Sequence, residues 1–292
     1  GIPEFGTAFA QGILEIARPR TIGEFTRVSG LSHGTDVWAG NARELIQNGV
    51  CTLSEAICNR DDIMLYLIRK GLPNKTSFKI MEAVRKGKGL TDEQATLMRE
   101  HDVPEWYIES CRKIKYMFPR AHAAAYVISA IWIAYYKVYH PEAFYAAYFS
   151  KAIKDFDIEL MVKGYQPITN AMKEIKEKGY GASQKDKSLL TILELAQEMY
   201  ARGIQFLPID IHQSHASKFL IRDGKLLPPF ASIAGVGESA AEGIAEAQEE
   251  GEFLSIEDLQ RRGRISSTVV ESLQRMGCLK GLPESNQLSL FV

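Results

Sequence analysis

The stretch from Lys113 to Tyr126 places cationic and aromatic side chains directly before a long apolar segment. Its charged and ring-bearing residues are Lys113, Lys115, Tyr116, Phe118, Arg120, His122 and Tyr126. Cations can neutralise phosphate groups, and aromatic faces can stack on bases. A rigid helix behind such residues would hold both kinds of group in place. The stretch therefore predicts a nucleotide-binding surface, although a loop with core aromatics and solvated charges has the same composition.

A second basic run lies upstream and contrasts with the formal charge of the whole chain, which is −1. Between residues 60 and 88 the acids are only Asp61, Asp62 and Glu82, whereas the bases are Arg60, Arg69, Lys70, Lys75, Lys79, Arg85, Lys86 and Lys88. A near-neutral chain has no general attraction for nucleic acid, so binding must come from such local clusters. The ending Arg85–Gly89 puts donors on a flexible turn that suits a triphosphate. A solvated helix face is the competing interpretation.

The spacing of apolar residues predicts a mainly α-helical chain. Before residue 203, helices are expected at Phe5–Ala17, Ile22–Val28, Trp38–Gln47, Arg60–Gly71, Thr76–Lys86, Thr91–His101, Pro104–Cys111, Ala121–Tyr139, Pro141–Ser150, Ala171–Gly179 and Leu189–Arg202. Ala121–Tyr139 is apolar nearly all round, which predicts a buried central helix. Its apolar run is shorter than the ~20 residues that span a bilayer, so no membrane partner is expected.

Residues 29–34, Ser-Gly-Leu-Ser-His-Gly, are expected to form a turn between two helices. Its two glycines would let a ligand approach the backbone closely. A plain connecting loop is an equally good interpretation of this segment.

The sequence offers no convincing metal site. Asp155-Phe156-Asp157 precedes a helical pattern, so we interpret these carboxylates as helix caps and not as metal ligands. The six histidines include no HExxH motif, which makes a structural zinc site unexpected. The four cysteines form no CxxC pair and are expected to be reduced thiols.

The pattern changes near residue 203, where we place a domain boundary. Ile204–Ile211 and Lys218–Arg222 look like strands, and Asp223-Gly224 predicts a hairpin turn. Two helix–hairpin–helix units are expected beyond them, with turns at Gly235-Val236-Gly237 and Gly263-Arg264-Ile265-Ser266. Such turns expose backbone N–H groups at a helix N-terminus, where a phosphate can bind. Two units can hold both strands of a DNA duplex without reading its sequence.

The last residues, Gln287-Leu288-Ser289-Leu290-Phe291, are more apolar than a disordered end should be. They are expected to dock into an apolar pocket, either on this chain or on a partner.

Four segments together resemble one known family. They are Ser29–Trp38, Val84–Leu90, Tyr116–Tyr126 and the ending that runs from Gly281 to Phe291. Over essentially its whole length the chain resembles the C-terminal part of a bacterial C-family replicative DNA polymerase, the polymerase III alpha subunit of PolC type. The resemblance implies a helical fingers domain followed by a small α+β domain with tandem helix–hairpin–helix units.

The resemblance also implies boundaries and roles. Residues 1–27 would end a palm or thumb region, 28–203 would be the fingers, 204–286 would bind duplex DNA and 287–292 would bind the sliding clamp (the beta subunit). The residues implied at the dNTP or the template are Ser29, Arg60, Lys79, Arg85, Lys86, Lys88, Lys115, Tyr116, Phe118, Arg120 and His122. Gly235, Val236, Gly237, Gly263, Arg264 and Ser266 would contact the duplex, and Gln287, Leu288, Leu290 and Phe291 the clamp.

One part of the family's machinery is not recognised in this sequence. The family's chemistry needs palm carboxylates that hold Mg²⁺, and no carboxylate pair lies on a plausible strand here. The chain is therefore expected to bind template–primer DNA, dNTP, the clamp and the rest of the polymerase. Its expected location is the cytoplasm, at the replisome on the nucleoid. On its own the chain is expected to be inactive. The alternative is a non-catalytic DNA-binding adaptor that has helix–hairpin–helix units and a clamp peptide.

Overall fold

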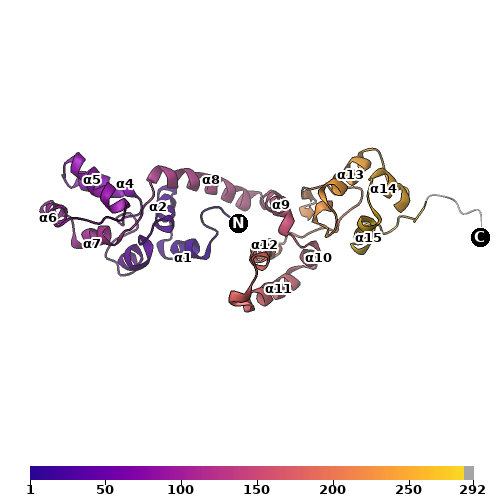
Figure 1. The fold of residues 1–292 in the computed structure, drawn as a ribbon, viewed down its shortest axis with the longest axis horizontal. Coiled ribbons are helices and arrows are strands. Elements are labelled where there is room, and N and C mark those ends of the chain that lie inside the picture. The colour runs from indigo at the N-terminus through magenta and orange to yellow at the C-terminus, as the bar shows by residue number, and fades with distance from the viewer. Residues whose placement is uncertain (286–292) are drawn as a thin grey trace, which may run out of the picture. The chain divides into compact units, whose positions relative to one another are not determined.

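The structure, a computed structural model, describes residues 1–285, which are mostly α-helical (Figure 1). The chain divides into two compact units, the first formed by Gly1–Tyr135 and the second beginning at Tyr136. Among the described residues there is one sheet, of two strands. The predicted fold class, mainly α with a small α+β part, is confirmed. Within residues 1–285 no helix is long and apolar enough to cross a membrane.

Several helices of the first unit begin at a capping residue. Their bounds are α1 Ala8–Ala17, α2 Ile22–His33, α3 Arg43–Gln47, α4 Arg60–Arg69, α5 Asn74–Arg85, α6 Asp92–Glu100, α7 Glu105–Lys113 and α8 Arg120–Tyr139, which continues into the second unit. Thr21 and Thr91 both form capping boxes, in which the threonine accepts from the third helical N–H and the side chain at that position accepts in return.

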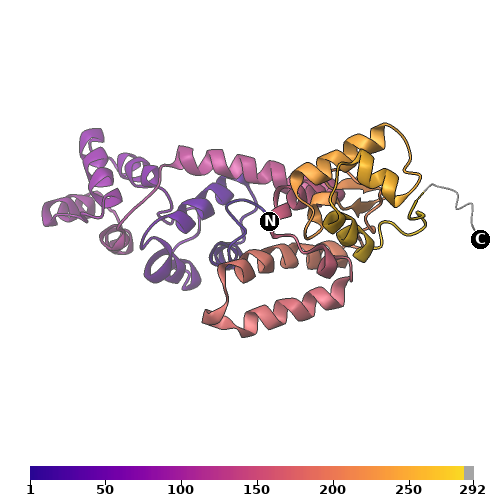
Figure 2. The same ribbon diagram turned by 45° about the vertical axis from the view of Figure 1, so that its right-hand side comes forward.

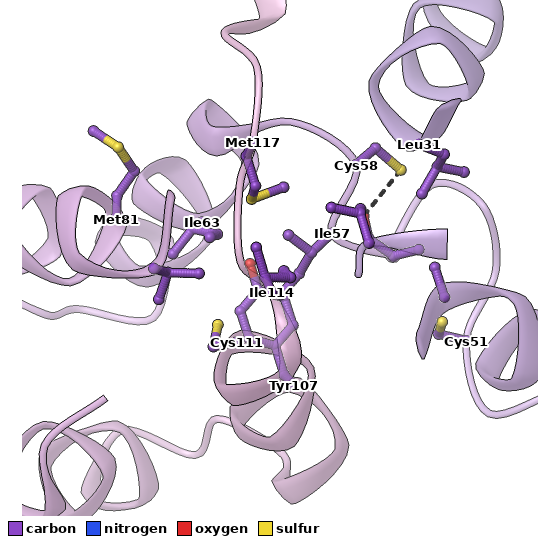
Figure 3. Close-up of a cluster of buried hydrophobic side chains, with 14 of the residues drawn as sticks. Leu31, Cys51, Ile57, Cys58, Ile63, Met81, Tyr107, Cys111, Ile114 and Met117 are labelled. Atoms are coloured by element: carbon purple, nitrogen blue, oxygen red, sulfur yellow. Dashed lines mark hydrogen bonds between the residues drawn. The ribbon is translucent and has the colours of Figure 1, made fainter. Parts of the chain in front are cut away.

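One core holds the first unit together. Figure 3 shows Ile63 of α4, Tyr107 of α7 and Met117 packed with Ile57 and Ile114, all of them buried. Burial of these apolar side chains is the main stabilising contribution to a unit of this kind. The core therefore fixes residues 57–63 and 107–117 next to each other, although they are distant in sequence.

The expected turn at residues 29–34 is not formed. Helix α2 continues to His33, and Ser29 and Gly30 are buried inside it. A Cβ atom at Gly30 would lie 2.4 Å from Asn59 Oδ1 and 2.5 Å from the carbonyl oxygen of Cys58. Close backbone approach, which the sequence assigned to a ligand, is therefore made by the chain itself. The expected helix Trp38–Gln47 is also interrupted, because Ala39, Gly40 and Asn41 have non-helical dihedral angles.

Helix α8 is not the buried central helix that its composition predicts. Ala123, Val127 and Ala130 face the core, whereas Ile128 and Trp132 are 42% and 67% exposed. An apolar helix buries all its faces only where other elements cover it, and within the described residues only one face of the first part of α8 is covered.

The second unit combines paired helices with a short hairpin. Its elements are α9 Pro141–Lys151, α10 Ile158–Met161, α11 Tyr165–Glu177, α12 Gln184–Ala201, β1 Leu220–Arg222, β2 Lys225–Leu227, α13 Glu238–Glu249, α14 Ile256–Arg262 and α15 Ser267–Arg275. Helices α11 and α12 lie side by side (Figure 2). Asp157 caps α10 by accepting from the Leu160 N–H at 3.1 Å, as its position before a helical pattern predicted.

The hairpin forms at Asp223-Gly224 as predicted, with Arg222 paired to Lys225. The expected strand Ile204–Ile211 does not form, and only Phe206 makes an isolated bridge, to Leu226. Pro208 has no N–H to extend the pairing. The Phe206 ring instead packs in an aromatic core, with its centroid 5.4 Å from those of Phe149 and Phe156.

All four cysteines, Cys51, Cys58, Cys111 and Cys278, are buried and free. Burial raises the pKa of the Cys58 thiol to about 12, so it stays protonated at neutral pH. These thiols are core residues, which agrees with the reduced state predicted from their spacing.

Candidate nucleic-acid interface

The segment from Ile114 to Arg120 crosses the first unit and is held by backbone hydrogen bonds from three other segments. Thr35 N–H donates to the Tyr116 carbonyl at 3.0 Å, and Tyr116 N–H donates to the Thr35 carbonyl at 3.4 Å. Met117 N–H donates to Arg85, and Arg60 N–H donates to Phe118. Segments that the sequence separates by up to 81 residues therefore meet here, as positions 35 and 116 show.

Aromatic side chains form a continuous series along this segment and the start of α8. The Tyr116 and Phe118 ring centroids are 5.2 Å apart in an edge-to-face arrangement, and the His122 ring stacks on Phe118 at 5.1 Å. Tyr126 follows, with its centroid 4.7 Å from that of His122. We call Tyr116, Phe118, His122 and Tyr126 the aromatic series. Tyr116 is 44% exposed, so its ring is available to stack on a base.

His33 belongs beside this series, although the sequence did not single it out. Its ring lies edge-on to Phe118 at 5.7 Å, and its Nε2 lies 3.0 Å from Glu4 Oε2. Ser29, predicted near the nucleotide, is buried one turn earlier and donates to the same carboxylate at 3.5 Å. The spacing of Ser29 and His33 by four residues was the available signal, because it places both on one face of a helix.

The glycine turn after α5 brings the basic run to the same place. Gly87 has φ +70°, and a Cβ atom there would lie 2.6 Å from the Lys115 carbonyl oxygen. This close contact puts the turn that carries Lys86 and Lys88 against the segment that carries Lys115 and Tyr116. All three lysines are exposed, so they can bind phosphate in the way that the sequence predicted.

Glu82 organises the two cations at the end of α5. Arg85 donates to it from two nitrogens, and Lys86 Nζ lies 2.9 Å from Glu82 Oε2. Hydrogen bonds from Arg85 and then from Lys86 lower the pKa of Glu82 to about 2. The carboxylate is thus ionised at neutral pH and reduces the net positive charge of this group.

The remaining predicted cations of the first unit lie in different surroundings. Arg60 starts α4, and its Nε is 4.0 Å from Asp61 Oδ2. Arg120 starts α8, where its backbone N–H donates to Asp61 Oδ2 at 2.6 Å. Lys79 lies on the exposed face of α5, two turns before Lys86. The fold therefore brings together Arg85, Lys86, Lys88, Lys115 and the aromatic series, with Arg60 and Arg120 on the adjacent α4–α8 side.

The two predicted hairpins of the second unit correspond residue by residue at an offset of 29 positions. Gly235 and Arg264 both have positive φ, +89° and +51°, and Gly237 and Ser266 are the N-caps of α13 and α15. Gly237, Arg264 and Ser266 are exposed. The residue before each N-cap, Val236 in the first turn and Ile265 in the second, is buried. Gly263 is buried as well, so it serves packing and does not form part of the exposed surface. The first hairpin follows only a single 3-10 turn, Phe230–Ser232, and not an α-helix.

The two hairpins also pack reciprocally on each other's helices. A Cβ at Gly235 would lie 3.0 Å from Ser272 Oγ of α15, and a Cβ at Gly243 of α13 would lie 2.4 Å from the Gly263 carbonyl. Gly243 and Ser272 are themselves equivalent positions at the same offset. This arrangement places two helix N-termini in related positions, and free N–H groups at such ends attract anions.

Arg262 joins this part together and was not recognised from the sequence. Its guanidinium donates to the carbonyls of Glu252 at 3.0 Å and Gly251 at 2.9 Å, and to Ala247. It also contacts Asp258 and lies 4.9 Å from the Phe253 ring centroid. Arg262 therefore serves structure, whereas Arg264, two residues later, projects from the exposed turn.

Two further parts of the predicted machinery are a metal site and the clamp-binding peptide. Residues 1–285 contain no group of three His, Cys, Asp or Glu side chains placed to hold a metal ion. The predicted clamp-binding residues Gln287, Leu288, Leu290 and Phe291 lie outside the described residues.

Two known families match separate parts of this chain. Residues 1–102 match the bacterial DNA polymerase III alpha subunit finger domain, and residues 203–288 match the helix-hairpin-helix motif. The two matches lie in different parts of the chain, one near its start and one in its last third.

Other known proteins are similar to this chain over its whole length. The chain is 57% identical over 291 residues to "DNA polymerase III PolC-type" from Caldanaerobacter subterraneus subsp. tengcongensis and from Bacillus subtilis, covering all of this chain and 21% and 20% of those proteins. The protein of the same name from Listeria innocua is 55% identical, with 20% covered. The chain is a homologue of a segment of PolC-type DNA polymerase III, which confirms the resemblance found in its motifs. It spans about a fifth of the length of these relatives.

Proposed function

We propose that this chain is the nucleotide-binding and duplex-binding part of a replicative DNA-directed DNA polymerase. Residues 28–203 would act as fingers, residues 204–286 would bind duplex DNA, and residues 1–27 would adjoin a palm or thumb. The observation that supports this most directly is that the turn with exposed Lys86 and Lys88 packs against the segment with exposed Lys115 and Tyr116. A non-catalytic adaptor needs only DNA-binding hairpins and would have no use for such a cluster.

In this proposal the aromatic series receives the incoming dNTP. The base stacks on the Tyr116 ring. The rings of Phe118 and His122 support the Tyr116 ring from behind. The lysines around Gly87 contact the phosphates. Replacing Tyr116 with Ala is expected to weaken dNTP binding about 5- to 150-fold, because stacking on an aromatic ring contributes about 1–3 kcal/mol per base. Titration of the purified chain with a fluorescent dNTP in the presence of Mg²⁺ would measure this.

Tyr180 provides a matched control, because it is fully exposed in the second unit. The Tyr180→Ala variant should bind dNTP like the parent chain. Equal binding by Tyr116→Ala and the parent would contradict the assignment of the aromatic series. An Arg85→Ala variant should also lose affinity, since it removes the cation that neutralises Glu82 beside the site.

The hairpins would hold the template–primer duplex through its phosphates. Affinity for duplex should therefore fall linearly with the logarithm of salt concentration and should not depend on sequence. The exposed acids of α13, which include Glu242, Glu246 and Glu249, must face away from the DNA.

The peptide Gln287–Phe291 is proposed to bind the sliding clamp. Replacing Leu290 and Phe291 together with Ala is expected to abolish binding to the clamp, because both apolar side chains would fill its pocket. Surface plasmon resonance with immobilised clamp would measure the loss, and duplex affinity should stay unchanged. Parallel loss of duplex binding would show that these residues stabilise the second unit instead.

The chemistry itself is assigned to a palm outside this chain. Carboxylates of that palm would hold Mg²⁺ together with the dNTP, and Mg²⁺ would stabilise charge on the reacting phosphate. Residues 1–285 contain no group of carboxylates placed to hold such an ion. The exposed apolar face of α8, with Ile128 and Trp132, is the proposed contact with the rest of the polymerase. The working location would be the cytoplasm, at the replisome on the nucleoid.

Complementation would test this division of labour. Primer extension should require both this chain and a separately supplied palm-containing fragment. Extension by this chain alone would contradict the proposal. Failure of the pair to extend, despite proven association, would favour the adaptor.

A further inference from the structure

A cavity of about 520 Å³ opens in the first unit on the side of α4 that carries Arg69. Four cations line it: Arg27 of α2, Arg69 of α4, Lys70, and Arg120 at the start of α8. Tyr66 and Tyr107 contribute its aromatic wall, with their rings stacked at 4.2 Å. The aromatic series does not line this cavity. Arg120 and His122, two residues apart at the start of α8, project in different directions, because successive helical positions differ by about 100°.

The two carboxylates in the wall are already occupied by donors from the protein. Asp62 Oδ2 accepts from the N–H groups of Cys58 at 3.1 Å and Asn59 at 2.9 Å, and Arg27 lies 3.4 Å away. Glu55 Oε2 accepts from both the N–H and the hydroxyl of Thr52 at 2.8 Å. Within residues 1–285 neither carboxylate forms an ion pair with the other three cations.

Two of those cations are available to a ligand. Within residues 1–285 neither Arg69 nor Arg120 forms an ion pair through its side chain, and both are exposed. Lys70 is held more firmly, since its Nζ donates to the Asp102 carbonyl at 2.8 Å and lies 5.8 Å from the Tyr66 centroid. Four cations and two carboxylates leave the cavity with a formal charge of +2.

We propose that this cavity binds a nucleotide of the unpaired template strand, with its phosphodiester groups on Arg69 and Arg120. The inference rests on the function proposed above. A charge of +2 matches one or two phosphodiesters, each of charge −1, better than a triphosphate of charge near −4. The volume lies in the range of about 300–1,000 Å³ that is usual for sites binding a small ligand. Cations combined with aromatic rings are the usual composition of sites for single-stranded nucleic acid.

The test compares a primer–template that has a 5′ overhang of ten thymidines with the same duplex made blunt. Binding to the chain is measured by fluorescence anisotropy, for the parent chain and for the Arg69→Gln, Arg120→Gln and double variants. The parent should prefer the overhang, and the double variant should lose about tenfold affinity for it. For the overhang DNA, the slope of the logarithm of the binding constant against the logarithm of salt concentration should also become shallower by about 1.4. Each single-strand phosphate contact contributes about 0.7 to that slope.

Lys75→Gln is the matched control, since Lys75 is an exposed cation at the start of α5 that does not line the cavity. It should bind both DNAs like the parent. Blunt-duplex and dNTP affinities should be unchanged in the Arg69→Gln variant. The proposal is overturned if the parent shows no preference for the overhang, or if the double variant retains it. Loss of dNTP binding instead would assign the cavity to the triphosphate. Failure of the proposed function would look different, because the parent would then bind neither blunt duplex nor dNTP.

Discussion

Replacing Gly30 with Ala is expected to lower the free energy of unfolding of the first unit by about 1–3 kcal/mol, the range for overpacking a filled core. A Cβ there would lie 2.5 Å from the Cys58 carbonyl and 2.4 Å from Asn59 Oδ1. The Cys58 carbonyl is backbone, so it cannot turn away as a side chain can. The segment 58–60 must move, and it carries the Arg60 N–H that donates to Phe118. Affinity for dNTP should therefore fall together with stability.

Gly12 of α1 gives the matched control for this experiment. It is also a helical glycine of the first unit, but a Cβ there would meet nothing within 4 Å. Gly12→Ala should raise stability by about 0.5–1 kcal/mol, because alanine favours the helix. Denaturant unfolding followed by circular dichroism would measure both variants. A stable Gly30→Ala protein with unchanged dNTP affinity would show that segment 58–60 has room to move and does not position Phe118.

Replacing Arg264 with Gly is expected to separate stability from DNA binding. Arg264 has φ +51°, a conformation that costs about 1 kcal/mol for a residue with a side chain and is free of strain for glycine. Its equivalent in the first hairpin is Gly235, so the fold accepts glycine at this position. Stability should stay level or rise by up to about 1 kcal/mol. Duplex affinity should nevertheless fall about 5- to 20-fold. The slope of the logarithm of the binding constant against the logarithm of salt concentration should become shallower by about 0.9, because one phosphate contact is lost.

Calorimetry and anisotropy titrations over a range of salt concentrations would test both parts of this prediction. Arg261→Gly, in the last turn of α14, is a useful comparison. Arg261 pairs with Asp258 at 3.0 Å and lies before the turn, so its loss should change duplex affinity little. An Arg264→Gly variant that keeps full duplex affinity would mean that the second hairpin binds through its backbone alone. Replacing a strained residue at a functional turn can raise stability and lower function at the same time, because the strain is kept for the function.

The pH dependence of the α5 end follows from Glu82. Its pKa is lowered to about 2, from an ordinary value of 4.5, by the hydrogen bonds from Arg85 and Lys86. A lowered pKa in the folded state contributes stability at pH values above 4.5, and this contribution is lost as the pH falls from 4.5 towards 2. The cluster around Gly87 therefore keeps its arrangement throughout the neutral range in which nucleotide binding would be measured.

The elements determined by the sequence itself are those whose hydrogen bonds close within a few residues. Thr21 and Thr91 cap their helices, Asp157 caps α10 and Asp223-Gly224 turns the hairpin, each through partners at most four residues away. The two hairpin turns at Gly235 and Arg264 belong to the same group, because a helix start needs only its own N-cap. The motifs that indicated the polymerase family are likewise short and continuous.

Tertiary structure alone decided which of these pieces form a site. Residues 29–33 continue helix α2, against local expectation, because Gly30 packs on Cys58 and Asn59. The cluster around Tyr116 exists because Thr35, Arg60 and Arg85 all bond to one segment. Whether an apolar helix such as α8 is buried depends on what covers it, and composition carries no information about coverage. Long-range contacts of this kind depend on the packing of the whole core, so no local pattern in the sequence could specify them.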